Sequence, residues 1–214
     1  MDDTLNISGL SDDEEHLTSS QVLQQLEEIW MNERLSPNLM VCRSDITDCI
    51  LEQIQEMEEN ISKAQKNELK VSLHQLEVDR IRYMLSSYLR CRLEKIEKYA
   101  SSLIKEAADG DQSRLSPEEY TFARELTSGV EAHLMSSALR LMPKNLQSLN
   151  LQEYAPSLDR YVFLRVNSPE EGVIVDEETD QNNGDKIDFE VGAQHIMRYK
   201  PIEHFVESGV VSLL

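Results

Sequence analysis

Glycine, proline and aromatic residues are scarce in this chain of 214 residues. It holds 7 glycines, 6 prolines and 6% aromatic side chains. Collagen-like and low-complexity sequences need far more glycine or proline, and an all-β fold needs more residues suited to turns. The scarcity therefore excludes a fibrous or low-complexity protein and favours a largely helical one.

Basic residues, long apolar runs and cysteines are also few. The chain has 21 Lys and Arg against 40 Asp and Glu, a net charge of −19, which argues against a phosphate-binding surface over the whole molecule. No apolar run approaches the roughly 18 residues of a membrane span, and the N-terminus lacks the features of a signal peptide. We therefore expect an intracellular protein whose three cysteines, Cys42, Cys49 and Cys91, are reduced.

Motifs for catalysis or cofactor binding are missing. The chain has no phosphate loop, dinucleotide fingerprint or nucleophile elbow, and its five histidines are scattered. The segment 179–190 imitates a calcium loop at Gly184 and Glu190, but Thr179 stands where a carboxylate should be. We interpret it as a hairpin turn. We predict no catalytic residue, no cofactor and no metal site.

Charge and hydrophobic periodicity divide the chain into four segments. Residues 1–17 hold six acidic and no basic groups and are interpreted as a disordered tail. Residues 18–143 have helical periodicity, residues 144–158 are interpreted as a linker, and residues 159–214 are rich in β-forming residues. The predicted fold class is mainly α, with an N-terminal helical bundle-like domain followed by a small C-terminal β-rich domain.

Start and stop signals place the expected helices. Thr18 with Gln21 has capping-box spacing, Ser36-Pro37 offers a fresh start, and Asp45 is a candidate cap for a second helical run. A long helix is predicted from Leu69 to about Ala108, because this stretch contains no glycine or proline. Its apolar residues cover more than one side, which is typical of a central helix packed among others.

The last helix of the helical domain and the strands have local signals as well. Ser116-Pro117-Glu118-Glu119 combines an N-cap serine, a first-turn proline and a capping-box glutamate, and predicts a helix that runs to Pro143. Strands are predicted at 161–166, 173–175, 187–189, 195–199 and 210–213, with a short helix opened by Pro201.

One stretch departs from the acidic composition. Between Arg80 and Lys98, six basic residues face two acidic ones, interleaved with tyrosines. These cations can pair within the fold, pair with acidic groups of a partner, or contact nucleic-acid phosphate. The acidity of the chain favours the first two alternatives.

Several ordered segments resemble the subunits of the GINS replication complex, and the match is closest to the Sld-five type. The long-helix segment from Val71 to Lys98 carries most of the similarity. Coverage runs from about Val22 to the C-terminus, and the other matching segments are Trp30–Glu33, Leu115–Glu119, Met142–Leu146, Leu158–Val166 and Tyr199–Leu214. A helical domain followed by a β domain is also the order expected for this type of subunit.

The resemblance implies a non-enzymatic structural subunit. GINS is a nuclear, chromatin-associated heterotetramer that joins the Mcm ring and the Cdc-forty-five protein in the replicative helicase, where the ring hydrolyses ATP. The implied partners are three sister subunits and, through the complex, the Mcm ring and Cdc-forty-five. Direct DNA contact and an additional cytoplasmic pool stay open. Periodicity alone also allows the alternative of a helical adaptor of trafficking or cytoskeletal type.

Candidate interface residues come from two regions. Arg90 and Arg92 lie about 200° apart around a helix, so at most one can face a given partner, and the other should pair within the fold or meet a different surface. Ser11, followed by Asp12, Asp13 and Glu14, fits the target of an acid-directed kinase. The residues predicted to meet a partner are Tyr88, Arg90, Arg92, Lys95, Tyr161, Phe163, Val210, Leu213 and Leu214.

Overall fold

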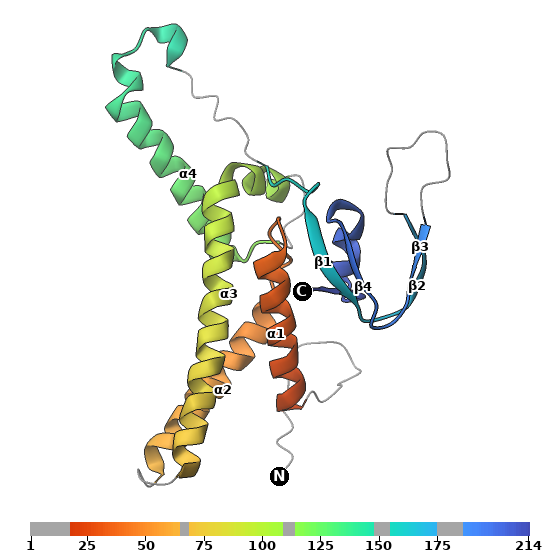
Figure 1. The fold of residues 1–214 in the computed structure, drawn as a ribbon. Coiled ribbons are helices and arrows are strands. Elements are labelled where there is room, and N and C mark those ends of the chain that lie inside the picture. Colours follow the sequence, from red (N-terminus) through yellow and green to blue (C-terminus); the bar gives the residue numbers. More distant parts are fainter. Residues whose placement is uncertain (1–17, 65–68, 109–113, 148–154, 175–185) are drawn as a thin grey trace. The chain divides into compact units, whose positions relative to one another are not determined.

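The computed structural model describes residues 18–64, 69–108, 114–147, 155–174 and 186–214. Within these ranges, four α-helices come first, and five short strands follow with one further α-helix between the last two (Figure 1). The predicted fold class, mainly α with a small C-terminal β-rich region, is confirmed. None of the described helices is both long enough and apolar enough to cross a membrane.

The helices are α1 (Ser19–Leu35), α2 (Ser44–Lys63), α3 (Leu69–Ala108), α4 (Pro117–Ser137) and α5 (Glu203–Glu207). Short 3₁₀ turns occupy Leu139–Leu141, Lys144–Leu146 and Lys200–Ile202. The strands are β1 (Tyr161–Val166), β2 (Glu170–Ile174), β3 (Lys186–Phe189), β4 (Gln194–Arg198) and β5 (Val211–Leu213).

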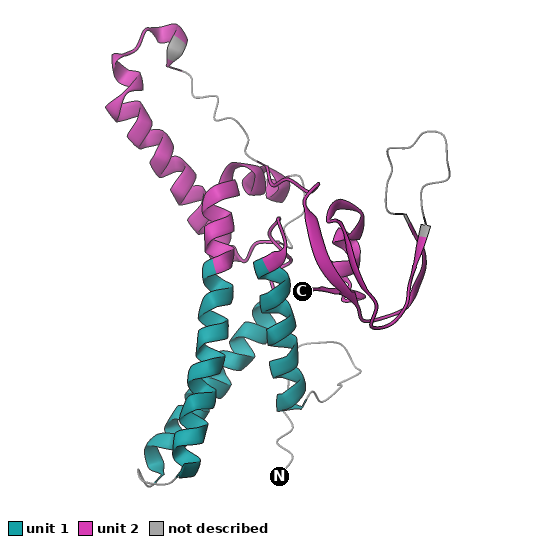
Figure 2. Ribbon diagram, viewed as in Figure 1, with its two compact units in different colours: residues 1–34, 43–90 teal, residues 35–42, 91–214 magenta. Residues whose placement is uncertain are grey.

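The chain forms two compact units (Figure 2). The first comprises residues 1–34 and 43–90, and the second comprises residues 35–42 and 91–214. The domain boundaries expected from the sequence remain a prediction. The expected acidic tail and Ser11 lie outside the described residues, as does the proposed hairpin turn around Gly184.

The first unit has a core of aliphatic side chains from α1, α2 and the part of α3 before residue 91. Its fully buried members recur at helical spacing, which is why the three helices pack along their apolar stripes. Trp30 Nε1 donates a hydrogen bond of 3.0 Å to Ser87 Oγ at the edge of this core. The buried residues are Val22, Leu26, Ile50, Ile54, Val78, Ile81, Met84 and Leu85.

Two of the predicted helix starts, at Thr18 and at Ser116, have the expected hydrogen bonds. The Thr18 amide donates to Gln21 Oε1 at 2.8 Å, and the capping box of α4 is complete, with the Glu119 amide donating to Ser116 Oγ and the Ser116 amide to Glu119 Oε2. Asp45 is not a cap: α2 begins at Ser44, and Asp45 lies in its first turn. There its carboxylate still complements the positive end of the helix dipole.

The predicted end of α4 at Pro143 and the helix start at Ser36-Pro37 are wrong. The helix α4 ends at Ser137, where the hydroxyls of Ser136 and Ser137 both donate to the His133 carbonyl and compete with the helical bonding pattern. Residues 36–43 are not helical.

The second unit contains two cores. Its helical core unites the part of α3 after residue 90 with α4, and Leu39 from the connection between α1 and α2 packs into it. The buried members of this core are Leu39, Ile96, Ala100, Leu103, Ala107, Leu115 and Ala123.

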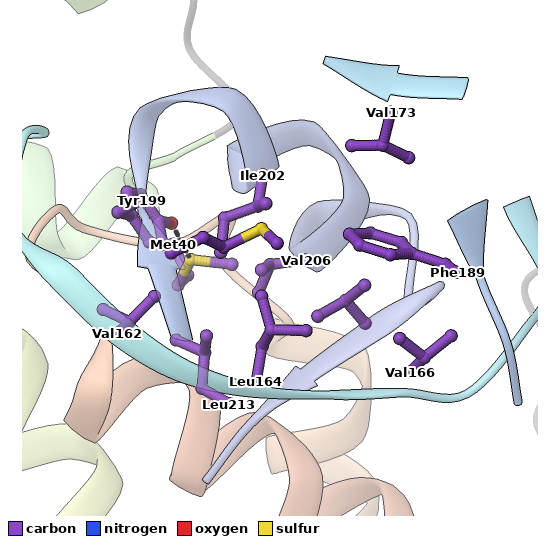
Figure 3. Packing of buried hydrophobic residues seen from close by; sticks show 12 residues of the cluster. Met40, Val162, Leu164, Val166, Val173, Phe189, Tyr199, Ile202, Val206 and Leu213 are labelled. Carbon is purple, nitrogen blue, oxygen red and sulfur yellow. Dashed lines mark hydrogen bonds between the residues drawn. The ribbon is translucent and has the colours of Figure 1, made fainter. Parts of the chain in front are cut away.

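The β core of the second unit lies under a three-stranded antiparallel sheet in the order β4-β1-β5. Burial alternates along β1, so Val162, Leu164 and Val166 face inward. The strands β2 and β3 form a separate antiparallel pair. The inward side chains pack against α5 and against Met40, whose sulfur accepts a hydrogen bond of 3.2 Å from the Tyr199 hydroxyl (Figure 3).

The last two residues provide a test of the β core. Leu213 is buried in it, whereas Leu214 is 47% exposed. Leu213→Ala is expected to lower the free energy of opening of the β1 amides by about 2–5 kcal/mol, because it leaves a cavity in a packed core. The matched variant Leu214→Ala should change it by less than about 0.5 kcal/mol. Hydrogen exchange measures both, and equal effects would contradict the placement of β5.

Candidate interaction surfaces

Arg92, one of the predicted interface residues, is fully buried and bound within its own chain. Its Nε and Nη2 atoms donate to the two Glu119 carboxylate oxygens at 2.8 and 2.7 Å. Its guanidinium also donates to the Met40 carbonyl at 2.9 Å and the Arg114 carbonyl at 2.7 Å. A planar guanidinium suits this bidentate pairing, which Lys could not reproduce. Arg92 therefore acts through the fold of the second unit.

Three cations hold the non-helical residues 38–40 by their backbone carbonyls. Lys95 Nζ donates to the Asn38 carbonyl at 2.7 Å and Arg114 Nη1 to the Leu39 carbonyl at 3.3 Å. Arg92 binds the next carbonyl, that of Met40. We refer to Arg92, Lys95 and Arg114 on these three carbonyls as the carbonyl clamp. It satisfies successive acceptors that lie outside any helix or sheet.

The carbonyl clamp continues into helix α5. Arg114 Nη2 lies 2.8 Å from Glu203 Oε1 and 3.3 Å from Glu207 Oε1. The Asn38 side chain donates to the same Glu203 oxygen at 2.6 Å. The clamp thus joins residues 38–40, α5 and the start of α4 by hydrogen bonds and ion pairs.

Sequence reasoning missed most of this network. Glu119 was expected only as a capping residue, and Met40, Asn38 and Arg114 were not singled out. One signal was present, because Arg92 lies in helical phase with Tyr88 and Ile96, both of which are buried. A cation on the buried face of a helix requires acceptors from elsewhere in the chain.

The other predicted residues of the basic stretch differ in exposure. Tyr88 is buried in the first unit, whereas Arg90 is exposed on α3. Lys95 is half-buried and donates to Ser36 Oγ as well as to the Asn38 carbonyl. Of the two arginines, Arg92 pairs within the fold, as expected for one of them. Arg90 presents its side chain to solvent.

Helix α3 also presents an apolar stripe. Leu69, Leu73, Leu76 and Tyr83 are 57–77% exposed and follow a spacing of four and three residues, with Arg80 completing the series. We call these five residues the α3 seam. They lie roughly opposite the buried residues Val78, Ile81 and Leu85 of the same helix, at 100° per residue. The spacing is that of a helix-to-helix contact.

Ion pairs fix the polar member of the α3 seam. Arg80 donates to Glu27 Oε1 at 2.6 Å and to Glu77 Oε1 at 2.7 Å. The hydrogen bond from Arg80 holds the pKa of Glu77 below its ordinary value. The small stability that this pair contributes is present above the unfolded pKa and is lost as pH falls through the lower folded pKa.

The remaining predicted residues lie in the β region. Tyr161 and Phe163 are exposed on the outer face of the three-stranded sheet, and Leu214 is beside Phe163, to whose carbonyl its amide donates at 3.1 Å. Val210 is half-buried, and Leu213 faces the core. The sheet therefore turns Tyr161, Phe163 and Leu214, but not Leu213, toward solvent.

In the part of the chain that the structure describes, we find no cluster of ionisable side chains that suggests a catalytic or metal site. Within those residues no group of three or more His, Cys, Asp and Glu side chains could hold a metal ion. Burial and then the neighbouring Glu52 raise the pKa of the Cys49 thiol. A raised pKa keeps the thiol protonated and makes it a poorer nucleophile.

The carbonyl clamp predicts a strong contrast between two neighbouring arginines. Arg92→Ala should lower the free energy of unfolding by about 3–5 kcal/mol, because it leaves Glu119 and the Met40 and Arg114 carbonyls without their buried cation. Arg90→Ala should change it by less than about 0.5 kcal/mol. Chemical denaturation followed by helical circular dichroism gives both values. An Arg92→Ala variant of unchanged stability would contradict the carbonyl clamp.

Arg92→Glu should weaken subunit assembly for the same reason, because loss of the clamp disrupts the fold of the second unit.

Comparisons with known proteins agree with the two structural regions. A family model described as the GINS complex protein helical bundle domain matches residues 45–138, and one described as the DNA replication complex GINS protein SLD5 C-terminus matches residues 156–214. Relatives named DNA replication complex GINS protein SLD5 include that of Mus musculus, 44% identical over 100% of both chains. That of Homo sapiens is 46% identical over 92% of this chain and 91% of its own, and that of Arabidopsis thaliana is 31% identical over 97% of each. The chain belongs to the SLD5 family of GINS DNA replication complex proteins.

Proposed function

We propose that this protein is a non-enzymatic structural subunit of a heterotetrameric GINS complex. In this proposal it binds three sister subunits, and the assembled complex joins the Mcm ring and the Cdc-forty-five protein in the replicative helicase. It acts in the nucleus, on chromatin, during initiation and fork progression. Family membership over the whole chain supports the proposal, and the names of the relatives place them in the GINS complex.

The α3 seam is the observation that carries the scaffold role. Three leucines and a tyrosine on one stripe of the longest described helix are more than half exposed. Complete burial of a leucine side chain contributes about 1.5–3 kcal/mol, so the stripe offers a substantial gain to a partner that covers it. The spacing of the four apolar residues fits an opposing helix, which is the form of partner that a helical sister subunit supplies.

The interface residues predicted from the sequence fall into two roles under this proposal. Arg90, Tyr161, Phe163 and Leu214 are exposed and can meet a partner directly. Tyr88, Arg92 and Leu213 are buried in their own chain and support assembly by holding the surfaces in place. Lys95 and Val210 are half-buried, and Lys95 belongs to the carbonyl clamp. Phosphorylation of Ser11 stays a prediction for the N-terminal segment.

A charge placed on the α3 seam tests the proposed assembly. Leu73→Glu combined with Leu76→Glu should abolish a four-subunit peak when the chain is co-expressed with its three sister subunits and resolved by size exclusion. Two carboxylates buried in an apolar helix contact without partners cannot be accommodated. The variant chain should keep its circular dichroism spectrum, because both positions are exposed in the first unit.

The control shifts each substitution by one residue on the same helix. Ser72→Glu combined with Gln75→Glu adds the same charge at exposed polar positions outside the α3 seam. This variant should assemble like the unmodified chain. A four-subunit peak with the seam variant, or its loss with both variants alike, would argue against the seam as a subunit interface.

A further inference from the structure

The outer face of the three-stranded sheet has an ordered arrangement of side chains. Phe163 on β1 lies opposite Ile196 on β4, and Leu214 extends the row on the β5 side. Phe163 and Ile196 are each 61% exposed, and Leu214 is 47% exposed. The sheet therefore carries a row of three large apolar side chains across its strands, on the side away from its core.

An arginine lies on each side of this apolar row. Two residues before Phe163, Tyr161 pairs with Arg198, and the guanidinium carbon lies 6.0 Å from the tyrosine ring centroid. Two residues after Phe163, Arg165 is exposed and pairs with Gln194 on β4 and Ser212 on β5. At about 3.3 Å per residue, the two arginine rows lie about 13 Å apart.

Among the described residues, the outward positions of these three strands hold no Asp or Glu side chain, although the surrounding segment is acidic. Residues 157–214 contain 12 acidic and 5 basic side chains. The outward positions of β1, β4 and β5 are Tyr161, Phe163, Arg165, Gln194, Ile196, Arg198, Ser212 and Leu214. An acid-free apolar and arginine surface in an acidic region marks a site with its own electrostatic character.

We infer that this sheet face binds a protein segment that has an apolar anchor flanked by carboxylates. The anchor packs on Phe163, Ile196 and Leu214, and the carboxylates pair with Arg165 and Arg198. Exposed aromatic and arginine side chains around an apolar centre have the composition of interface hot spots. Arginine forks bind carboxylates bidentately, which fixes the register of the segment across the two rows.

A nucleic acid fits this face less well. Phosphate binding depends on many cations in a positive field, and here two arginines stand in a chain of net charge −19. Ile196 and Leu214 add aliphatic surface that bases do not require for stacking. The balance of two cations with three apolar side chains favours an acidic protein segment.

Photo-crosslinking at the centre of the face tests the inference. The full chain is expressed in cells with benzoylphenylalanine in place of Phe163, irradiated, and its crosslinked peptides are sequenced by mass spectrometry. The expected product joins position 163 to a protein segment with Asp or Glu on both sides of an aliphatic or aromatic residue. Arg165→Glu combined with Arg198→Glu should lower the yield at least fivefold, since each replaces an attraction by a repulsion.

The matched control is Arg160→Glu combined with Lys200→Glu, which makes the same charge change at exposed positions flanking β1 and β4. It should leave the yield within twofold. Four results would each overturn the inference. Two concern the product, which would be a crosslink to nucleic acid or to a protein segment without flanking carboxylates. The other two are an unchanged yield after charge reversal of Arg165 and Arg198, and no crosslink at all. The inference rests on the proposed function only for its cellular setting, and that function is judged separately by whether the three sister subunits co-purify with the chain.

Discussion

The second unit depends on the way three cations bind three successive carbonyls. Residues 38–40 are neither helical nor in a sheet, so their carbonyl oxygens need hydrogen-bond donors from elsewhere in the chain. Lys95, Arg114 and Arg92 supply them in order along the segment. Arg92 is itself fully buried, and it is stable there because Glu119 neutralises it and two carbonyls accept its remaining donors.

This constraint decides where the neighbouring side chains go. With its backbone held, Leu39 packs into the helical core, Met40 enters the β core, and the Asn38 side chain binds Glu203 of α5. One short segment thus takes part in both cores of the second unit. The inward face of β1 is fully used by this packing, so the residues available to a partner are those of its outward face. On the first unit, the core leaves the apolar residues of the α3 seam exposed.

Local signals in the sequence were enough to predict much of the fold. The bounds of α3 follow from a stretch without glycine or proline, the start of α4 from the Ser116 capping box, and β1 from its run of β-forming residues. The carbonyl clamp could not be predicted in the same way. Its bonds join residues 52, 57 and 75 positions apart, and no local pattern specifies which cation meets which carbonyl. For the α3 seam, the sequence showed only that the helix is apolar on more than one side. It does not show which of these sides the rest of the chain covers and which is left exposed.

We propose that this chain is one of four different subunits in a single scaffold. Native mass spectrometry of the complex purified through a tag on this chain tests it most directly, because the mass gives both the members and their stoichiometry. The account predicts one copy of this chain with one copy of each of three GINS sister subunits. A monomer, a homo-oligomer of this chain, or a complex lacking the sister subunits would contradict it.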